Sequence, residues 1–394
     1  MTFDSLAQRL APHYSRFRVS ERLLMTGHSH QAWPDVAREG QLEAFDVAAR
    51  DVDAKWAAAF EKAEVLRGYL RDYYDDPTGR YTFSANTHDL VVRWLSSLDL
   101  KARSHVITTD GEFHSLTRQL RRLQEVGLGV TFLPASPSEG FVERLESALT
   151  ERTAAVCLSR VYFKTGLVQP HLTAIAALCR QAGVPLLIDD YHGTHAVPLS
   201  LRDAGLEDCF LVSGGYKYLQ WGEGNCFLRF PSGCALRPVV TGWFASFDTL
   251  ADARGDQPVS FDQGDERFAG ATFDPTSQFR AARVVAFFRE QGLTPEVLRA
   301  HSQAQIGWLR EQFMALGLDE NRITLMHQRP IEENGGFLAL RSPEAQRLKA
   351  ALLERGVATD ARDDSLRFGP APYTTQAQLE AALGHLAEAV RELG

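Results

Sequence analysis

Lys217 is the residue of this sequence best placed for covalent chemistry. It follows the apolar run 209–212, which predicts a buried strand, and it lies in the turn 213–219, which is rich in small residues. Desolvation at such a position lowers the pKa of an amine and frees the amine for Schiff-base formation. Most lysines after a strand are solvated surface residues, so the interpretation depends on what lies near Lys217.

A carboxylate follows a second predicted strand. The apolar run 184–188 ends in Asp189 and Asp190, and His192 comes three residues after Asp189. A single acid at a strand end is usually a turn or capping residue. An acid facing a pyridinium nitrogen, together with a lysine that carries the cofactor, is the pair that pyridoxal phosphate chemistry requires. The sequence therefore predicts a pyridoxal 5'-phosphate site built on Asp189 and Lys217.

Composition excludes several other classes of protein. The net charge of −8 and the pI near 5.9 argue against nucleic acid or an anionic membrane as the main partner. No apolar stretch approaches the roughly 20 residues of a membrane span, and the first residues lack the layout of a signal peptide. The five cysteines have no metal-site spacing, which predicts reduced thiols and a cytoplasmic location.

Helical and strand patterns alternate from about residue 60 to residue 230. Strands are predicted at 106–109, 130–133, 154–158, 186–189 and 210–213, and helices at 87–100, 116–126 and 171–181. This alternation predicts an α/β fold with a mostly parallel sheet, whose ligands bind at the carboxyl ends of the strands.

The rest of the chain is organised differently. Residues 245–275 form a long polar segment, and segments of this kind are often functional. Beyond it, helices are predicted at 280–291, 295–316, 343–355 and 375–392, with strands at 336–340 and 365–368. We expect an N-terminal segment (1–50) that contributes to the active site, a large cofactor-binding domain (51–277) and a small α+β domain (278–394).

Three short motifs occur in a characteristic order: Asp-x-x-His at 189–192, Tyr-Lys-Tyr-Leu at 216–219 and Leu-Arg-Phe-Gly at 366–369. Their combination resembles the class V aminotransferase group of fold-type I pyridoxal-phosphate enzymes, and within that group most closely kynureninase. The resemblance implies a seven-stranded type of sheet flanked by helices. It also implies a homodimer with its active site at the subunit interface, acting on a small-molecule substrate that is an α-amino acid.

The resemblance also implies individual roles in holding the cofactor. Lys217 would carry it and act as the catalytic base, Asp189 would face the pyridine nitrogen, and His192 would lie beside the ring. The phosphate and the ring faces would be held by Asn86, Thr87, Phe113, Tyr216, Trp243 and Thr272, with Thr272 arriving from the neighbouring subunit. A helix beginning at Thr87 suits a phosphate, because its free N–H groups and dipole attract anions.

The residues that would face the substrate depart from the family pattern. Arg367 matches the arginine that clamps the α-carboxylate, for which a guanidinium fork is well suited. Kynureninases carry Gly-Asn-Ser-Leu-Gly where residues 27–31 here read Gly-His-Ser-His-Gln, which places His28 and His30 in the substrate pocket. Tyr162 also stands where the family has a different, polar residue, and His114 follows Phe113 where the family has proline. A metal site formed by His28 and His30 with His192 and His195 is disfavoured, since no convincing ligand set accompanies them.

Three functions remain open from the sequence. The first is kynureninase-like hydrolysis of a Cβ–Cγ bond, which releases alanine and an aromatic acid. The second keeps the cofactor but performs transamination, β-elimination or another reaction on a different amino acid, as the altered segment 27–31 suggests. The third, a non-catalytic binding protein, is disfavoured because Lys217 is retained.

Overall fold

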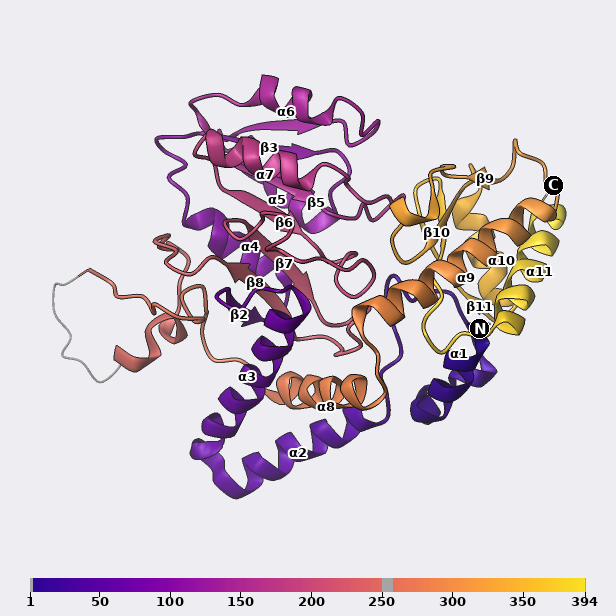
Figure 1. Ribbon diagram of the computed structural model, residues 1–394, viewed down its shortest axis with the longest axis horizontal. Helices are drawn as coiled ribbons and strands as arrows, with labels where there is room; N and C mark the ends of the chain where they lie inside the picture. The colour runs from indigo at the N-terminus through magenta and orange to yellow at the C-terminus, as the bar shows by residue number, and fades with distance from the viewer. Residues whose placement is uncertain (1–2, 250–257, 394) are drawn as a thin grey trace.

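The computed structural model describes residues 3–249 and 258–393, which form two lobes (Figure 1). The larger lobe is built on a seven-stranded sheet and the smaller on a four-stranded sheet. Helix α9 (Pro295–Ala315) runs from one lobe to the other, and both chain ends lie in the smaller lobe. Residues 250–257, within the segment 245–275 predicted to be functional, lie outside the described residues.

The large sheet confirms the predicted α/β class. Its strand order is β2-β8-β7-β6-β5-β3-β4, with β3 to β7 parallel to one another and β8 antiparallel to both of its neighbours. The five predicted strands are β3 (His105–Thr109), β4 (Gly129–Leu133), β5 (Thr153–Ser159), β6 (Leu186–Asp189) and β7 (Phe210–Gly214). The other two strands are β2 (Arg80–Ser84), which runs in the same direction as β3 to β7, and β8 (Cys226–Phe230), which runs opposite to them.

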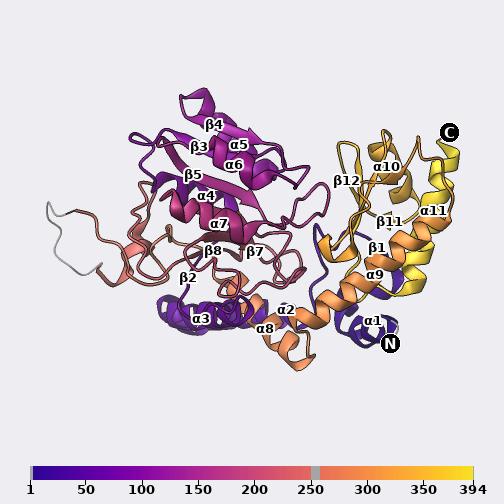
Figure 2. The ribbon, with the colours of Figure 1, turned by 45° about the horizontal axis from the view of Figure 1, so that its top comes forward.

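Helices cover both faces of this sheet (Figures 1 and 2). One face packs against α3 (Lys55–Tyr73), α6 (Phe141–Ala148), α7 (Leu172–Gln181) and α8 (Thr276–Glu290). The other face packs against α4 (Thr87–Ser96) and α5 (His114–Glu125). Helix α2 (Val36–Asp51) lies along α8. Helix α4 ends four residues before the predicted position 100, where the Ser97 hydroxyl donates to the Trp94 carbonyl.

The smaller lobe has its own hydrophobic core. Its antiparallel sheet has the order β12-β13-β10-β9 and is covered by helices. The strands are β9 (Thr324–Leu325), β10 (Leu338–Arg341), β12 (Asp360–Arg362) and β13 (Ser365–Phe368), and the helices are α9, α10 (Ala345–Glu354) and α11 (Gln376–Glu392). The predicted strand at 365–368 and helix at 375–392 are confirmed here.

The N-terminal residues join this smaller lobe. After α1 (Asp4–Leu10), strand β1 (Leu23–Leu24) pairs in parallel with β11 (Val357–Ala358). The pairing continues to a bridge between Thr26 and Gly369. Segment 27–31 therefore lies beside the strand that carries Arg367. Across residues 3–249 and 258–393, no helix has both the length and the apolar character needed to cross a membrane, and no group of three metal-ligating side chains occurs.

Candidate active site

A cavity of about 460 Å³ opens at the carboxyl ends of β5, β6 and β7. Seven of the residues predicted for the site line it: Asn86, Thr87, Phe113, Asp189, His192, Tyr216 and Lys217. They come from separate parts of the chain, which meet because the parallel strands end at one edge of the sheet. The tertiary structure therefore assembles the predicted cofactor residues around one space.

Lys217 is buried in this cavity, just beyond the end of β7. Its Nζ lies 2.6 Å from His192 Nε2 and 4.6 Å from the centre of the Tyr191 ring. Burial lowers the pKa of Lys217 to about 7, although the negative charge of Asp189 opposes this shift. The amine is therefore neutral in a large fraction of molecules near neutral pH, which is the form that acts as a nucleophile or base.

Asp189 and His192 form the wall beside the lysine. Asp189 ends β6, and its Oδ1 accepts a hydrogen bond from the Tyr191 backbone N–H at 2.9 Å. Burial raises the pKa of Asp189, while the nearby Lys217 amine lowers it. Burial also holds the pKa of His192 well below its usual value. Among the described residues, His192 Nδ1 has no hydrogen-bond partner. A buried ring nitrogen without a partner is suited to contact a bound molecule.

A buried ion pair between Arg160 and Asp190 anchors the chain directly after Asp189. The next residue, Asp190, is fully buried and accepts from Arg160 Nε at 2.5 Å and from Arg160 Nη2 at 3.0 Å. Tyr74 and Thr194 donate further hydrogen bonds to Asp190 Oδ2, at 2.8 Å and 3.0 Å. Since Asp190 is fixed by four hydrogen bonds, the carboxyl end of β6 has little freedom to move.

The opposite end of the cavity is suited to an anion. Helix α4 begins at Thr87, and the Asn86 side chain caps it by accepting from the Asp89 N–H at 2.9 Å. The remaining free N–H groups of this first turn and the helix dipole favour a phosphate. Tyr216 also lines the cavity, where its hydroxyl can serve the same anion.

The structure adds wall residues that the sequence did not predict. Among them are Ser159, Val161, Phe163, Tyr191 and Cys226. Burial raises the pKa of the Cys226 thiol to about 12, so this thiol stays protonated and is a poor nucleophile. Ser159 pairs in register with Asp189 on the neighbouring strand. That pairing could have been found from the sequence by aligning the ends of adjacent predicted strands.

The predicted substrate residues lie outside the cavity wall. Arg367 on β13 is buried, and its Nη1 donates to the Phe163 carbonyl at 2.5 Å. His28 is fully buried against the Phe337 ring, with the ring centres 4.7 Å apart. His30 stacks on Tyr216 with ring centres 4.6 Å apart, so it lies at the rim.

Tyr162 points away from the cavity. Its hydroxyl accepts a hydrogen bond from Gln169 Nε2 at 3.0 Å, and its ring lies against Gly111. The two flanking residues, Val161 and Phe163, face the cavity instead. The structure therefore places Tyr162 in the support of the wall, and a direct contact with substrate would require it to turn.

Trp243 and Thr272 lie apart from Lys217 in this chain. Trp243 Nε1 donates to Thr272 Oγ1 at 3.3 Å, and Trp243 is 42% exposed. Thr272 lines a second cavity of about 500 Å³, which shares Ala85 and Glu223 with the first. This placement leaves both side chains free to approach a second copy of the chain, as the predicted dimer requires.

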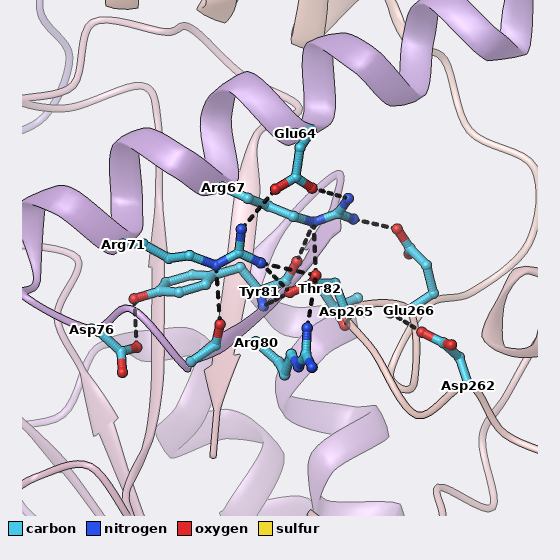
Figure 3. A network of polar contacts seen from close by, with 11 residues as sticks. Glu64, Arg67, Arg71, Asp76, Arg80, Tyr81, Thr82, Asp262, Asp265 and Glu266 are labelled. Carbon is cyan, nitrogen blue, oxygen red and sulfur yellow. Dashed lines mark hydrogen bonds and ion pairs between the residues drawn. The ribbon is translucent and has the colours of Figure 1, made fainter. Parts of the chain in front are cut away.

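A charged network fixes the segment before Thr272 to the large lobe (Figure 3). Arg71 on α3 donates to both carboxylate oxygens of Asp265, at 3.0 and 3.1 Å, and Arg67 pairs with Glu266. The backbone N–H of Tyr81 on β2 also donates to Asp265, at 2.7 Å. The network therefore holds this segment against α3 and the edge strand β2.

The buried lysine predicts a pH-dependent stability. An unfolded lysine has a pKa of about 10.4, and Lys217 has about 7, so the unfolded chain binds more protons between these values. Stability should therefore rise from about pH 7 to about pH 10. We expect Lys217→Met to abolish this part of the rise and to stabilise the cofactor-free protein near neutral pH. Guanidinium unfolding at several pH values measures both effects. The exposed Lys101→Met is the control, and an unchanged pH slope in Lys217→Met would contradict the prediction.

Comparison with known proteins agrees with this geometry. Residues 84–221 match the family model described as aminotransferase class-V, and residues 279–386 match the kynureninase C-terminal domain. A relative named uncharacterized aminotransferase YcbU, from Bacillus subtilis, is 22% identical over 84% of this chain and 85% of its own length. A kynureninase from Pseudomonas fluorescens is 29% identical over 62% of this chain and 58% of its own length. A mitochondrial cysteine desulfurase from Candida maltosa is 25% identical over 46% of this chain, and the match spans 38% of that protein.

Solved structures share the fold. A mutant of C-DES, with glycine covalently linked to its pyridoxal-phosphate cofactor, has a TM-score of 0.81 at 18% identity and covers 96% of this chain and 98% of its own. A cysteine desulfurase from Thermococcus onnurineus has a TM-score of 0.80 at 14% identity, with 98% of both chains covered. Residues 84–221 are therefore similar to class V aminotransferases and residues 279–386 to the kynureninase C-terminal domain, and the chain shares the fold of these pyridoxal-phosphate proteins.

Proposed function

We propose that this protein hydrolyses the Cβ–Cγ bond of an aryl-keto α-amino acid and releases alanine and an aromatic acid. The observation that carries the proposal is the buried Lys217, with a pKa of about 7, beside His192 and Asp189. Support for the kynureninase type of reaction comes from the family match over 279–386, the region that contains Arg367.

Pyridoxal 5'-phosphate is the cofactor that the class V aminotransferase match and the fold indicate. The cavity residues fit it: a neutral buried amine, a buried carboxylate and a helix N-terminus that suits a phosphate. Lys217 would hold the group covalently, Asp189 would partner its ring nitrogen, and Phe113 would lie on its face. When bound, the cofactor withdraws electrons from the substrate carbons through its protonated ring.

The chain's own residues supply the proton transfers. Neutral Lys217 Nζ can take a proton from the substrate α-carbon, and it can return a proton to the β-carbon after cleavage. His192 Nε2, at 2.6 Å, can accept a hydrogen bond from Lys217 Nζ, because the depressed pKa of His192 keeps its ring neutral. Phe113, Val161 and Phe163 give this end of the cavity an apolar wall, and the single water molecule that the hydrolysis consumes enters from solvent.

Two further proposals concern the surroundings of the reaction. Arg367 binds the substrate α-carboxylate, with His28 and His30 on the N-terminal side of the same region. The active unit is a homodimer in which Trp243 and Thr272 of one copy approach the cofactor phosphate of the other. The pairing of these two side chains away from their own cavity supports this assignment. Sedimentation of the purified protein measures the oligomeric state.

A second candidate is transamination or β-elimination on another amino acid. The relative named an uncharacterized aminotransferase, matched over most of both chains, favours it, as do the histidines of segment 27–31. Cysteine desulfuration is less well supported, because a persulfide carrier needs an accessible thiol. Cys157, Cys179, Cys209 and Cys226 are buried, and burial also raises the pKa of the partly exposed Cys234.

The test is to mix the cofactor-loaded protein with L-kynurenine or its ring-hydroxylated form and to follow the aromatic acid and alanine. Release of both at roughly 1–10³ per second supports the proposal. Formation of a keto acid, with conversion of the cofactor to its amine form, would instead establish transamination. A spectrum that responds to other amino acids, without cleavage of either kynurenine, would move the search to the second candidate.

A further inference from the structure

Asp360, on β12, forms an ion pair with Arg367, the arginine proposed to bind the substrate carboxylate. Its Oδ2 pairs with Nη2 of Arg367, which faces it from the neighbouring strand β13. We propose that Asp360 is a specificity-determining residue: a displaceable carboxylate that reserves Arg367 for ligands bearing a carboxylate of their own. This inference rests on the proposed function, and it defines the substrate class through a competing group within the chain.

The hydrogen bonds of Arg367 leave one edge available. Nη1 donates to the Phe163 carbonyl at 2.5 Å and Nη2 is paired with Asp360, while the buried Nε has no partner among residues 3–249 and 258–393. A carboxylate that binds a guanidinium in the two-pronged manner takes two neighbouring nitrogens. Nε and Nη2 form such a pair, so an incoming carboxylate competes with Asp360 for Nη2. A ligand without a carboxylate has nothing to offer in exchange.

Asp360 retains partners when it gives up Arg367. Its other oxygen, Oδ1, accepts from Arg362 Nη1 at 2.6 Å. On the Oδ2 side, His28 Nε2 lies 3.8 Å away, and neither ring nitrogen of the fully buried His28 has a hydrogen-bond partner in the part of the chain that the structure describes. A buried carboxylate left alone is costly, and these two residues reduce the cost of the exchange. His28 would thus become a hydrogen-bond partner of Asp360 when Asp360 releases Arg367.

The location connects this exchange to the cavity. Phe163 lines the cavity and its carbonyl holds Arg367, while the Phe337 ring lies between His28 and His192, at 4.7 Å and 5.8 Å from their ring centres. Arg367 is therefore one residue behind the cavity wall. A substrate carboxylate that draws the guanidinium toward itself would separate it from Asp360.

Acetate and methylamine are the probes, because they carry the carboxylate and the amine alone. Their affinities can be measured by thermal-shift titration of the full chain, with and without added pyridoxal phosphate. We expect Asp360→Asn to bind acetate about tenfold more tightly than the unmodified protein, with methylamine unaffected. The control is Asp363→Asn. Asp363 directly follows β12 and its side chain is 80% exposed, so this variant removes the same charge and should leave acetate binding unchanged. Unchanged or weaker acetate binding in Asp360→Asn overturns the proposal, as does an equal gain in the control.

Arg362→Gln gives an independent result of opposite sign. Without Arg362, Asp360 depends more on Arg367 and should release it less readily, so acetate should bind more weakly. This variant decides the matter if Asp360→Asn fails to fold, and tighter acetate binding by Arg362→Gln would contradict the proposal. Because acetate binding requires no turnover and is also measured in the absence of cofactor, its result is independent of whether the enzyme cleaves kynurenine. On the active enzyme, Asp360→Asn should lower KM for the amino acid substrate by more than it changes kcat.

Discussion

Replacing Lys217 by alanine should reduce turnover by at least about 10³-fold, the largest effect we expect on activity. The variant loses the amine that we propose holds the cofactor covalently and moves protons at the substrate carbons, and proton transfer alone is worth roughly 10²–10⁴-fold. Borohydride reduction followed by peptide mass analysis should label Lys217 in the unmodified protein and nothing at this position in the variant. Initial rates of alanine release give the loss in turnover.

The controls separate chemistry from folding. Lys101→Ala removes an exposed lysine and should retain full activity and full labelling. Lys217→Arg preserves a positive charge but cannot provide a neutral amine, so it should be as inactive as Lys217→Ala. Activity within tenfold of the unmodified enzyme in Lys217→Ala would refute the assignment of this residue as both carrier and base.

Asp190→Asn should destabilise the fold by about 3–5 kcal/mol, the largest effect we expect on stability. Asp190 is fully buried and receives two hydrogen bonds from the buried Arg160, as well as those from Tyr74 and Thr194. Removing one partner of such a pair leaves the other charge buried without compensation, which accounts for this magnitude. Unfolding in guanidinium, followed by tryptophan fluorescence and circular dichroism, measures the change.

An exposed ion pair provides the matched control. Asp208 pairs with Arg180 at 2.6 Å, and its side chain is 67% exposed. Asp208→Asn should therefore leave stability nearly unchanged, since solvent screens pairs at the surface. If both variants unfold at the same denaturant concentration as the unmodified protein, the Asp190 network does not stabilise the fold as we infer. Because Asp189 adjoins this network, Asp190→Asn should also weaken cofactor binding.

The sequence determined the framework of the large lobe and the identity of its reactive groups. Largely apolar runs of four or five residues predicted β3 to β7, because strands buried on both faces are mostly apolar along their length. Residues that directly follow such strands meet at one sheet edge, so Asp189 and Lys217 could be placed together before their contacts were known. The order of three short motifs was enough to predict the family and its cofactor.

The sequence did not show which side chains of the segment that follows β5 point into the cavity. Residues 159, 161 and 163 face the cavity in alternation, so Arg160 and Tyr162 point to the other side. The predicted strand ended at residue 158. Beyond a strand, side chains need not alternate between the two sides of the backbone, so the sequence did not show which of residues 159–163 face the cavity. For this reason Tyr162 was predicted to contact substrate, whereas the structure places Phe163 on the wall.

Pairings between distant residues were decided only by the tertiary structure. Arg160 with Asp190 and Arg67 with Glu266 join segments that no local pattern links. A charged residue can pair with any opposite charge that the chain brings within reach, so its sequence position does not select the partner. The sequence thus determined which groups can react, and the packing of the two lobes decided which charge faces each of them.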